Sequence, residues 1–447
     1  MIPLSRSTPN RFLVALCAAL FAATPAAAQQ RPAPNPSEGD AAVIAVPTLA
    51  TDKVVETDAG STWALANQIA DLISADLKTT NRFIVADVKN VRIPSYPEVA
   101  APAFPVWRSA GTKLLLSGFV NARSDGRLTI GCYVYDVQSG RELARQGFAV
   151  APSEWRRAAH RCADAAYTKV TGDRPLFDSR IAYVAQSGRD ESPTKRLAVM
   201  DFDGGNHSFL TQGDSTVITP RWSPGMDRIA YSSFSGGTLH VRLVDVATGR
   251  DGALLQPGSM SFAPAFAPDG ERIAFSMPVN GNTDIYMTPI GGAYPQRLTS
   301  APSVDTSPGY SPDGRQIVFS SDRSGAPQLY VMDSDGSNQR RISFGQGEYG
   351  SPVWSPDGER IAFTNVQGAV TRIGAMNANG SDERILSAGP SDEQPTWSPD
   401  SRRILFQRVD PAASRTALAI VAATGGEVRP VPTPLAATDP VWASRQE

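Results

Sequence analysis

Acidic side chains recur beside one repeated motif of this chain, where they could act together on a substrate. Each stands within four residues before a proline that opens a Pro-x-aromatic unit; they are Asp305, Glu348, Asp392, Glu393 and Asp439. Carboxylates that converge suit acid–base chemistry on a glycan or a phosphodiester. The alternative is that each is a solvated loop residue. Whether these carboxylates converge depends on the strands and loops that position them.

Other catalytic arrangements lack the residues that they require. The segment Gly213-Asp214-Ser215-Thr216-Val217 has no second glycine to make the elbow of a serine hydrolase. The three histidines, His160, His207 and His240, fall on separate segments without metal-ligand spacing, so we expect solvated or satisfied side chains. Asp333 to Gly336 is similar to a calcium-binding loop but lacks its closing glutamate, which favours a turn. We therefore expect no enzyme, metal or cofactor.

A short strand of the type Arg-Ile-Ala-Phe occurs six times, beginning at residues 180, 228, 272, 316, 360 and 403. From the second occurrence onward the spacing is 43 or 44 residues. Five of the strands follow a Pro-x-aromatic unit, with the aromatic at Trp222, Phe266, Tyr310, Trp354 and Trp397. A repeat of this length is typical of a β-propeller blade, which has about four strands and packs against its neighbours.

The first and the last of these repeats are each incomplete, and each supplies what the other lacks. The first strand, at Arg180, has no Pro-x-aromatic unit before it, whereas the last nine residues carry such a unit around Trp442 with no strand after it. The C-terminal strand should therefore complete the first blade. This pairing predicts an all-β propeller of six blades that leaves no open sheet edge.

In such a propeller the Pro-x-aromatic strand is the innermost one, so the residues before it should surround one mouth of the central channel. Loops on a rigid scaffold are common binding sites, and apolar groups within a polar rim suit a protein partner. The predicted partner-binding residues are Met260, Ser261, Phe262, Asp305, Thr306, Glu348, Tyr349, Asp392, Glu393 and Asp439.

A smaller α+β domain should precede the propeller, with the boundary near residue 172. Its predicted elements are strands at 42–47 and 83–85, helices at 63–77 and 155–170, a loop at 94–105, and a hairpin of 113–121 with 128–136. The domains are therefore expected at 29–172 and 173–447.

The first 28 residues have the layout of a secretory signal peptide: Arg6 and Arg11, an apolar run at 12–23, and three alanines before Gln29. Residues 29–40 are rich in proline and should form a flexible tail. After export, Cys132 and Cys162 could form a disulfide or remain as two buried thiols. A net charge of −2 without basic patches argues against nucleic acid, and we expect a monomer without a membrane span.

The order of these parts resembles the TolB family of the Tol-Pal envelope system. The resemblance is carried by the junction Phe177 to Val184, the run Lys195 to Asp201, and the segment Ser307 to Gly314. It implies a non-enzymatic periplasmic adaptor that binds the outer-membrane lipoprotein Pal through the propeller.

The resemblance also implies that the N-terminal region binds TolA of the inner-membrane TolQ-TolR-TolA complex, with other outer-membrane proteins as further partners. Such an adaptor maintains outer-membrane integrity and envelope constriction during cell division. The alternative function is an exported propeller hydrolase or lyase that acts on peptide or glycan with acidic residues at the channel mouth.

Overall fold

A computed structural model describes residues 41–88, 91, 93–188, 193–255, 259–292, 294–389, 391–410 and 415–444. The predicted signal peptide at 1–28 and the proline-rich tail at 29–40 lie outside these residues. Among the described residues, no helix has the length and apolar character needed to cross a membrane.

The N-terminal part is a five-stranded sheet with two long helices on one face. The strand order is β4-β1-β5-β6-β7, with β1 parallel to β4 and β5 and the other pairs antiparallel. The elements are β1 Ala42–Ala45, β2 Glu56–Thr57, β3 Gly60–Ser61, α1 Thr62–Lys78, β4 Phe83–Val85, η1 Tyr96–Val99, α2 Phe104–Ser109, β5 Leu114–Ala122, β6 Leu128–Asp136, β7 Glu142–Val150, η2 Pro152–Glu154 and α3 Trp155–Thr171.

Helix α1 follows directly from its sequence. The Ser61 hydroxyl accepts the backbone N–H of Ala64 and so caps the helix. Leu65, Ile69 and Ile73 recur at helical spacing, and all three are fully buried in the core that α1 shares with α3 and the sheet.

Two local features differ from the sequence prediction. The predicted loop at 94–105 contains the short helix η1 and the start of α2. Strand β7 was not predicted, because this edge strand is largely exposed and lacks the alternation of apolar residues that marks a half-buried strand.

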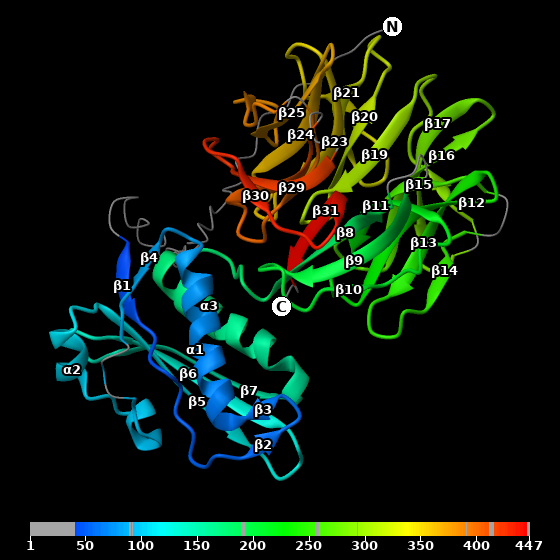
Figure 1. The fold of residues 1–447 in the computed structure, drawn as a ribbon. Helices are drawn as coiled ribbons and strands as arrows, with labels where there is room; N and C mark the ends of the chain where they lie inside the picture. Colours follow the sequence, from blue (N-terminus) through cyan, green and yellow to red (C-terminus); the bar gives the residue numbers. More distant parts are fainter. Residues whose placement is uncertain are drawn as a thin grey trace, which may run out of the picture.

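The propeller consists of six four-stranded sheets, as the repeats predict. The innermost strands contact one another around a ring, and Figure 1 shows the blades arranged about it. From the innermost strand outward, the blades are as follows: β31 Ala436–Ser444, β8 Ser179–Ser187, β9 Thr194–Asp201 and β10 Ser208–Phe209; β11 Thr216–Trp222, β12 Arg228–Ser235, β13 Thr238–Asp245 and β14 Asp251–Ala253; β15 Phe262–Phe266, β16 Arg272–Val279, β17 Asn282–Pro289 and β18 Gln296–Arg297.

The remaining three blades repeat this order. They are β19 Asp305–Tyr310, β20 Gln316–Ser321, β21 Gln328–Asp333 and β22 Arg340–Arg341; β23 Glu348–Trp354, β24 Arg360–Gln367, β25 Val370–Asn377 and β26 Arg384–Ile385; β27 Asp392–Trp397, β28 Arg403–Asp410, β29 Arg415–Ala422 and β30 Arg429–Val431.

The C-terminal strand closes the ring, which confirms the prediction from the incomplete ends. Strand β31 pairs antiparallel with β8, from Ala436 opposite Gln186 to Ser444 opposite Ser179. The indole N–H of Trp442 donates to the Ser179 hydroxyl at 2.8 Å, and the Trp442 backbone N–H donates to the Thr396 hydroxyl of the last blade at 3.2 Å. The first blade is therefore built from both ends of the propeller sequence.

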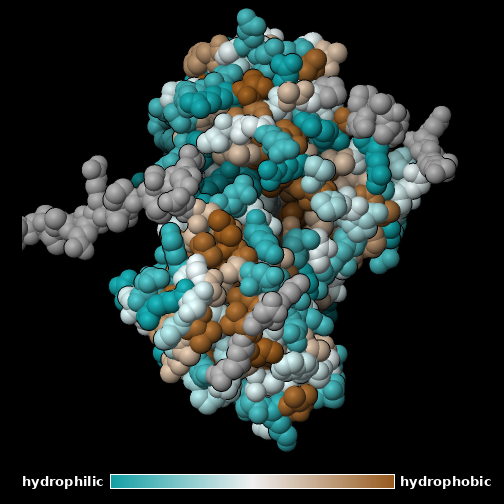
Figure 2. All heavy atoms as spheres, turned by 60° about the vertical axis from the view of Figure 1, so that its left-hand side comes forward, coloured by the Kyte–Doolittle hydropathy of each residue, from teal (hydrophilic) through white to brown (hydrophobic). Residues whose placement is uncertain are grey.

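The two domains share one hydrophobic core. Tyr167 of α3 and Phe177 of the connecting segment belong to the same buried cluster as Tyr183 of the first blade, Leu405 of the last blade and Trp442. Figure 1 shows α1 and α3 on the side of the domain toward the propeller, with α2 on the far side. On the face in Figure 2, apolar side chains are interspersed with polar ones and form no single broad apolar surface.

The closing strand predicts a specific loss of stability. Deletion of residues 439–447 should open the ring and promote aggregation, because β8 then presents an unpaired edge. Trp442→Ala alone should lower the free energy of unfolding by about 3–5 kcal/mol, since the side chain is only 8% exposed. Thermal unfolding and light scattering measure both effects. The matched control is Trp63→Ala, at a tryptophan that is 46% exposed, and equal losses at the two sites would contradict the closure argument.

Cys132 of β6 and Cys162 of α3 form a disulfide, which resolves the choice that the sequence left open. The bond closes a loop over a sequence separation of 30 residues. Loop-closure entropy predicts that replacing both cysteines by serine lowers the free energy of unfolding by about 3–4 kcal/mol. Urea unfolding with and without a reducing agent measures this. Reduction should destabilise the wild-type chain and leave the double variant unchanged.

Candidate partner-binding site

The residues predicted to surround the propeller mouth divide between two sides of the innermost strands. Ser261, Asp305, Tyr349 and Asp392 all lie three positions before their proline, and none is more than 1% exposed. The same position in the other two blades holds Val217 and Ala437, which are also buried.

Successive side chains on a strand point to opposite sides, so this position faces the interior of the blade. The prediction that these four residues line the rim is therefore wrong.

The two buried aspartates are held in ion pairs. Asp305 lies 2.8 Å from the Arg323 guanidinium and accepts the Ser303 hydroxyl at 2.9 Å. Asp392 binds Arg408 through both carboxylate oxygens, at 2.7 and 2.8 Å, and this contact raises the pKa of Arg408. A carboxylate is tolerated inside a protein only with such partners. Both aspartates therefore stabilise their blades and do not present a charge to a partner.

Tyr349 has a similar structural role. Its ring centroid lies 5.2 Å from that of Phe363, and its hydroxyl donates to a Glu383 carboxylate oxygen at 2.6 Å. Burial raises the pKa of the Tyr349 hydroxyl, and the Glu383 hydrogen bond adds to the effect. Tyr349 is part of the core of its blade and is not an exposed anchor for a partner.

Asp439 of the first blade contacts both the second and the last blade where the ring closes. It is one of six residues before the prolines that have φ between 47° and 55°, the others being Thr219, Ala263, Ser307, Ser351 and Gln394. Each lies at a β-bulge or irregularity of its innermost strand. Its backbone N–H is therefore displaced from the regular hydrogen bonds between the strands.

These displaced N–H groups find acceptors on the neighbouring blade. Ala263 donates to the Ser232 hydroxyl and Ser307 to the Ser276 hydroxyl. The first blade has Val184 at the corresponding position, which offers no acceptor. The Asp439 carboxylate therefore accepts the Thr219 N–H at 3.2 Å, while the Asp439 N–H donates to Gln407 at 2.9 Å. Burial raises the pKa of Asp439, whose role here is structural.

The remaining predicted residues do reach the surface of the mouth. Met260 and Glu348 are exposed, and Phe262, Thr306 and Glu393 are half-buried. Glu348 borders a cavity of about 430 Å³ lined by Gln346, Gly347, Glu348, Val366, Gln367 and Gly368. Sequence reasoning missed Gln346 and Gln367, because Gln346 lies in the loop before β23 and Gln367 at the end of β24, both outside the repeated motif.

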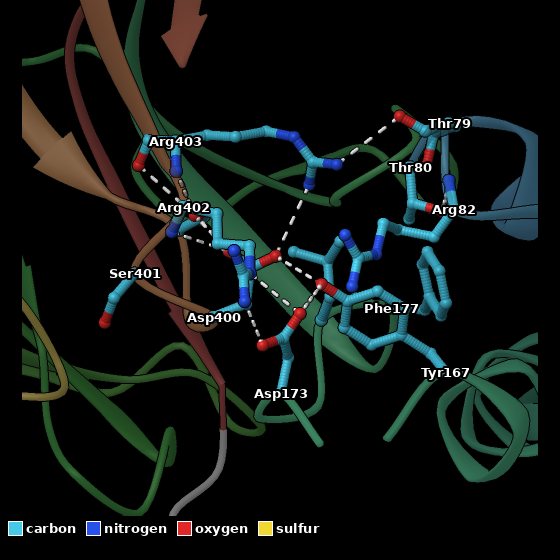
Figure 3. A network of polar contacts seen from close by, with 12 residues as sticks. Thr79, Thr80, Arg82, Tyr167, Asp173, Phe177, Asp400, Ser401, Arg402 and Arg403 are labelled. Carbon is cyan, nitrogen blue, oxygen red and sulfur yellow. Dashed lines mark hydrogen bonds and ion pairs between the residues drawn. The ribbon is translucent and has the colours of Figure 1, made fainter. Parts of the chain in front are cut away.

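The N-terminal domain contacts the opposite end of the propeller, and Figure 3 shows polar contacts between the two domains. Tyr167 donates its hydroxyl hydrogen bond to Asp400 at 3.0 Å, and Arg402 pairs with Asp173. Arg403 donates to the carbonyl of Thr79 at 3.4 Å, while Arg174 donates to that of Pro356 at 2.7 Å. The propeller residues in these contacts lie in the turns that follow the innermost strands or, for Arg403, at the first residue of the next strand. The mouth where those strands begin is therefore at the other end.

The side chains considered for serine or histidine chemistry have local partners. The Ser215 hydroxyl accepts a hydrogen bond from Ser233 at 3.0 Å. His207 contacts the Tyr183 hydroxyl at 2.8 Å, and His240 contacts the Thr238 hydroxyl at 2.7 Å. None of these contacts pairs a serine with a histidine.

The burial of Asp305 predicts an asymmetry between neighbouring residues. Asp305→Asn should lower the free energy of unfolding by about 3 kcal/mol, because it leaves the Arg323 charge without its partner. Thr306→Val, one residue further along, should change it by less than about 0.5 kcal/mol, since that side chain faces the channel. Urea unfolding measures the free energy of unfolding of both variants. Equal values would show that the Asp305–Arg323 ion pair does not stabilise the blade.

Comparison with known proteins agrees with this architecture. Residues 167–446 match the family model of the TolB beta propeller domain, and residues 39–143 match that of the TolB amino-terminal domain. The Tol-Pal system protein TolB of Zymomonas mobilis is 47% identical over 211 residues, covering 45% of this chain and 46% of that protein. The Tol-Pal system protein TolB of Rhizorhabdus wittichii is 48% identical over 220 residues, covering 49% and 50%. The chain thus matches about half the length of these curated relatives.

A solved structure extends the likeness to both domains. The crystal structure of TolB from Acinetobacter baumannii is 26% identical in sequence and superposes with a TM-score of 0.74. It covers 91% of this chain and 97% of the other. Because the propeller family model alone spans more than half of the sequence, the chain belongs to the TolB family of the Tol-Pal system.

Proposed function

We propose that this chain is a periplasmic adaptor that binds the lipoprotein Pal at the propeller mouth and TolA through its N-terminal region. The observation that carries the proposal is the position of the N-terminal domain. It is anchored by Tyr167, Asp173 and Arg174 to turns at one end of the propeller, which leaves the mouth at the other end accessible to a partner.

The chemistry of the mouth supports a protein partner. Met260 and Phe262 offer apolar surface, while Glu348 and Glu393 supply negative charge beside it. An apolar anchor within a polar, charged rim is the usual form of a protein interface. The segment of Pal that enters should therefore combine an apolar side chain with basic or hydrogen-bond-donating groups.

The adaptor function extends to the cell envelope. Residues 1–28 direct export, and the domain at 29–172 contacts TolA of the TolQ-TolR-TolA complex while the propeller at 173–447 holds Pal. This link supports outer-membrane integrity and constriction during division, and other outer-membrane proteins are further partners. A hydrolase or lyase is less well supported, because Asp305 and Asp392 are committed to buried ion pairs and are not available as an acid and a base.

Charge reversal at the exposed rim tests the Pal site. Glu348→Lys and Glu393→Lys should each slow association with purified Pal several-fold at low salt, with a smaller effect at high salt, because rim charges act mainly on encounter. Phe262→Ala should instead speed dissociation. Surface-immobilised kinetics at two salt concentrations separate the two effects.

The matched control is Asp313→Lys, in an exposed turn at the opposite end of a propeller blade. It should leave Pal binding unchanged. If Asp313→Lys abolished binding while the rim variants had no effect, Pal would bind the other end of the propeller and the proposed site would be wrong.

A further inference from the structure

A buried histidine lies at the junction of the two domains with one ring nitrogen unsatisfied. His160 of α3 is 1% exposed, and its Nδ1 lies 2.7 Å from a carboxylate oxygen of Asp76 in α1. Its Nε2 points toward Asp201, at the end of β9 in the first blade, but the distance of 3.9 Å is too long for a hydrogen bond. Asp203 follows in the adjoining turn.

Three unsatisfied polar atoms meet at this junction. Among the described residues, the buried side-chain atoms without a hydrogen-bond partner include His160 Nε2, Asp76 Oδ1 and Arg156 Nε, all within this one cluster. A buried polar atom without a partner costs free energy. Where several such atoms meet in a native protein, a water or an ion usually satisfies them.

We infer that His160, Asp201 and Asp203 together bind one Zn²⁺ ion. Each offers a ligand atom, and these atoms lie within 4.8 Å of one another. Tetrahedral zinc with bonds of about 2.0–2.2 Å holds its ligand atoms roughly 3.4 Å apart, so a closure of about 1 Å completes the site. An imidazole with two carboxylates is a ligand set that zinc favours, and water supplies the fourth position.

Neighbouring residues orient the proposed ligands. In the neutral tautomer that a metal ligand requires, Asp76 accepts the Nδ1–H of His160 at 2.7 Å, so that the lone pair of Nε2 is directed toward Asp201. Asn206 donates to the Asp201 carboxylate at 2.6 Å and so fixes its position. A carboxylate behind the ligating histidine and a hydrogen bond to the ligating carboxylate are the supports that zinc sites commonly have.

Arg156 is the competitor for this site. Its guanidinium lies 2.5 Å from Asp203 and 3.6 Å from Asp201, so without metal it neutralises part of their charge. Arg180 adds a second positive charge near Asp201. The carboxylates of Asp76, Asp201 and Asp203 nevertheless outnumber the cations Arg156 and Arg180.

The Arg156 guanidinium can move out of the site toward solvent. Its side chain is 22% exposed, that of Asp203 is 23% exposed, and the guanidinium already lies near the Trp155 ring, at 5.6 Å. A divalent ion that enters past Asp203 displaces the guanidinium toward solvent.

The bound ion would cross-link the domains. His160 belongs to the N-terminal domain, whereas Asp201 and Asp203 belong to the first blade. Zinc therefore holds α3 against the propeller and should raise the melting temperature of the whole chain as the free zinc concentration exceeds the dissociation constant.

Calorimetric titration of the untagged chain with Zn²⁺ tests the site, with visible absorption of the Co²⁺-substituted protein as the spectroscopic readout. We expect one equivalent to bind and the d–d bands of a site with nitrogen and oxygen ligands. His160→Gln should abolish this stoichiometric binding. His240→Gln, at a histidine outside the cluster, should bind as the wild type does.

Two further variants test the site even if His160→Gln does not fold. Asp203→Asn lies in the exposed turn, so it should fold even if His160→Gln does not, and it should weaken zinc binding about tenfold or more. Arg156→Gln should strengthen zinc binding about tenfold, because it removes the competing cation. Circular dichroism of each metal-free variant confirms folding. Failure of the wild type to bind one equivalent would overturn the inference, and so would undiminished binding by folded His160→Gln or Asp203→Asn.

Discussion

A ring of sheets holds together only if its first and last blades are joined, and most of this structure depends on that joint. Strand β31 supplies it by pairing with β8, with Trp442 bonded to Ser179 across 263 residues of sequence. The ordering entropy of so long a loop must be recovered from contacts that form together. The closing strand makes several at once, since it also bonds to Thr396 and Gln407 of the last blade and to Thr219 of the second.

The same joint determines where the N-terminal domain lies. Trp442, Phe177 and Tyr167 are parts of one buried cluster, so the domain packs against the blades that close the ring. The Asp400, Arg402 and Arg403 contacts then hold it to the turns at that end. A hydrophobic core continuous across both domains makes them one packed unit, while the rim residues Met260 and Glu348 stay exposed at the mouth.

Patterns of local sequence were sufficient for the architecture. The spacing of the Arg-Ile-Ala-Phe strands predicts blades, because each blade is one repeat whose strands and turns lie close together in the chain. The incomplete ends predict closure, and the helical spacing of Leu65, Ile69 and Ile73 predicts α1. These features need only the periodicity of side chains along one segment, which a single sequence displays.

The sequence by itself therefore determined the two-domain plan, the number of blades and the identity of the closing strand. Only the tertiary structure decided what individual side chains do. Asp305 and Glu348 look alike in the sequence, yet Asp305 meets Arg323 inside a blade whereas Glu348 reaches the surface. The disulfide of Cys132 with Cys162 and the meeting of His160 with Asp201 likewise join separate elements. The physical reason is that burial and partners depend on contacts between distant segments, and periodicity within one segment carries no information about them.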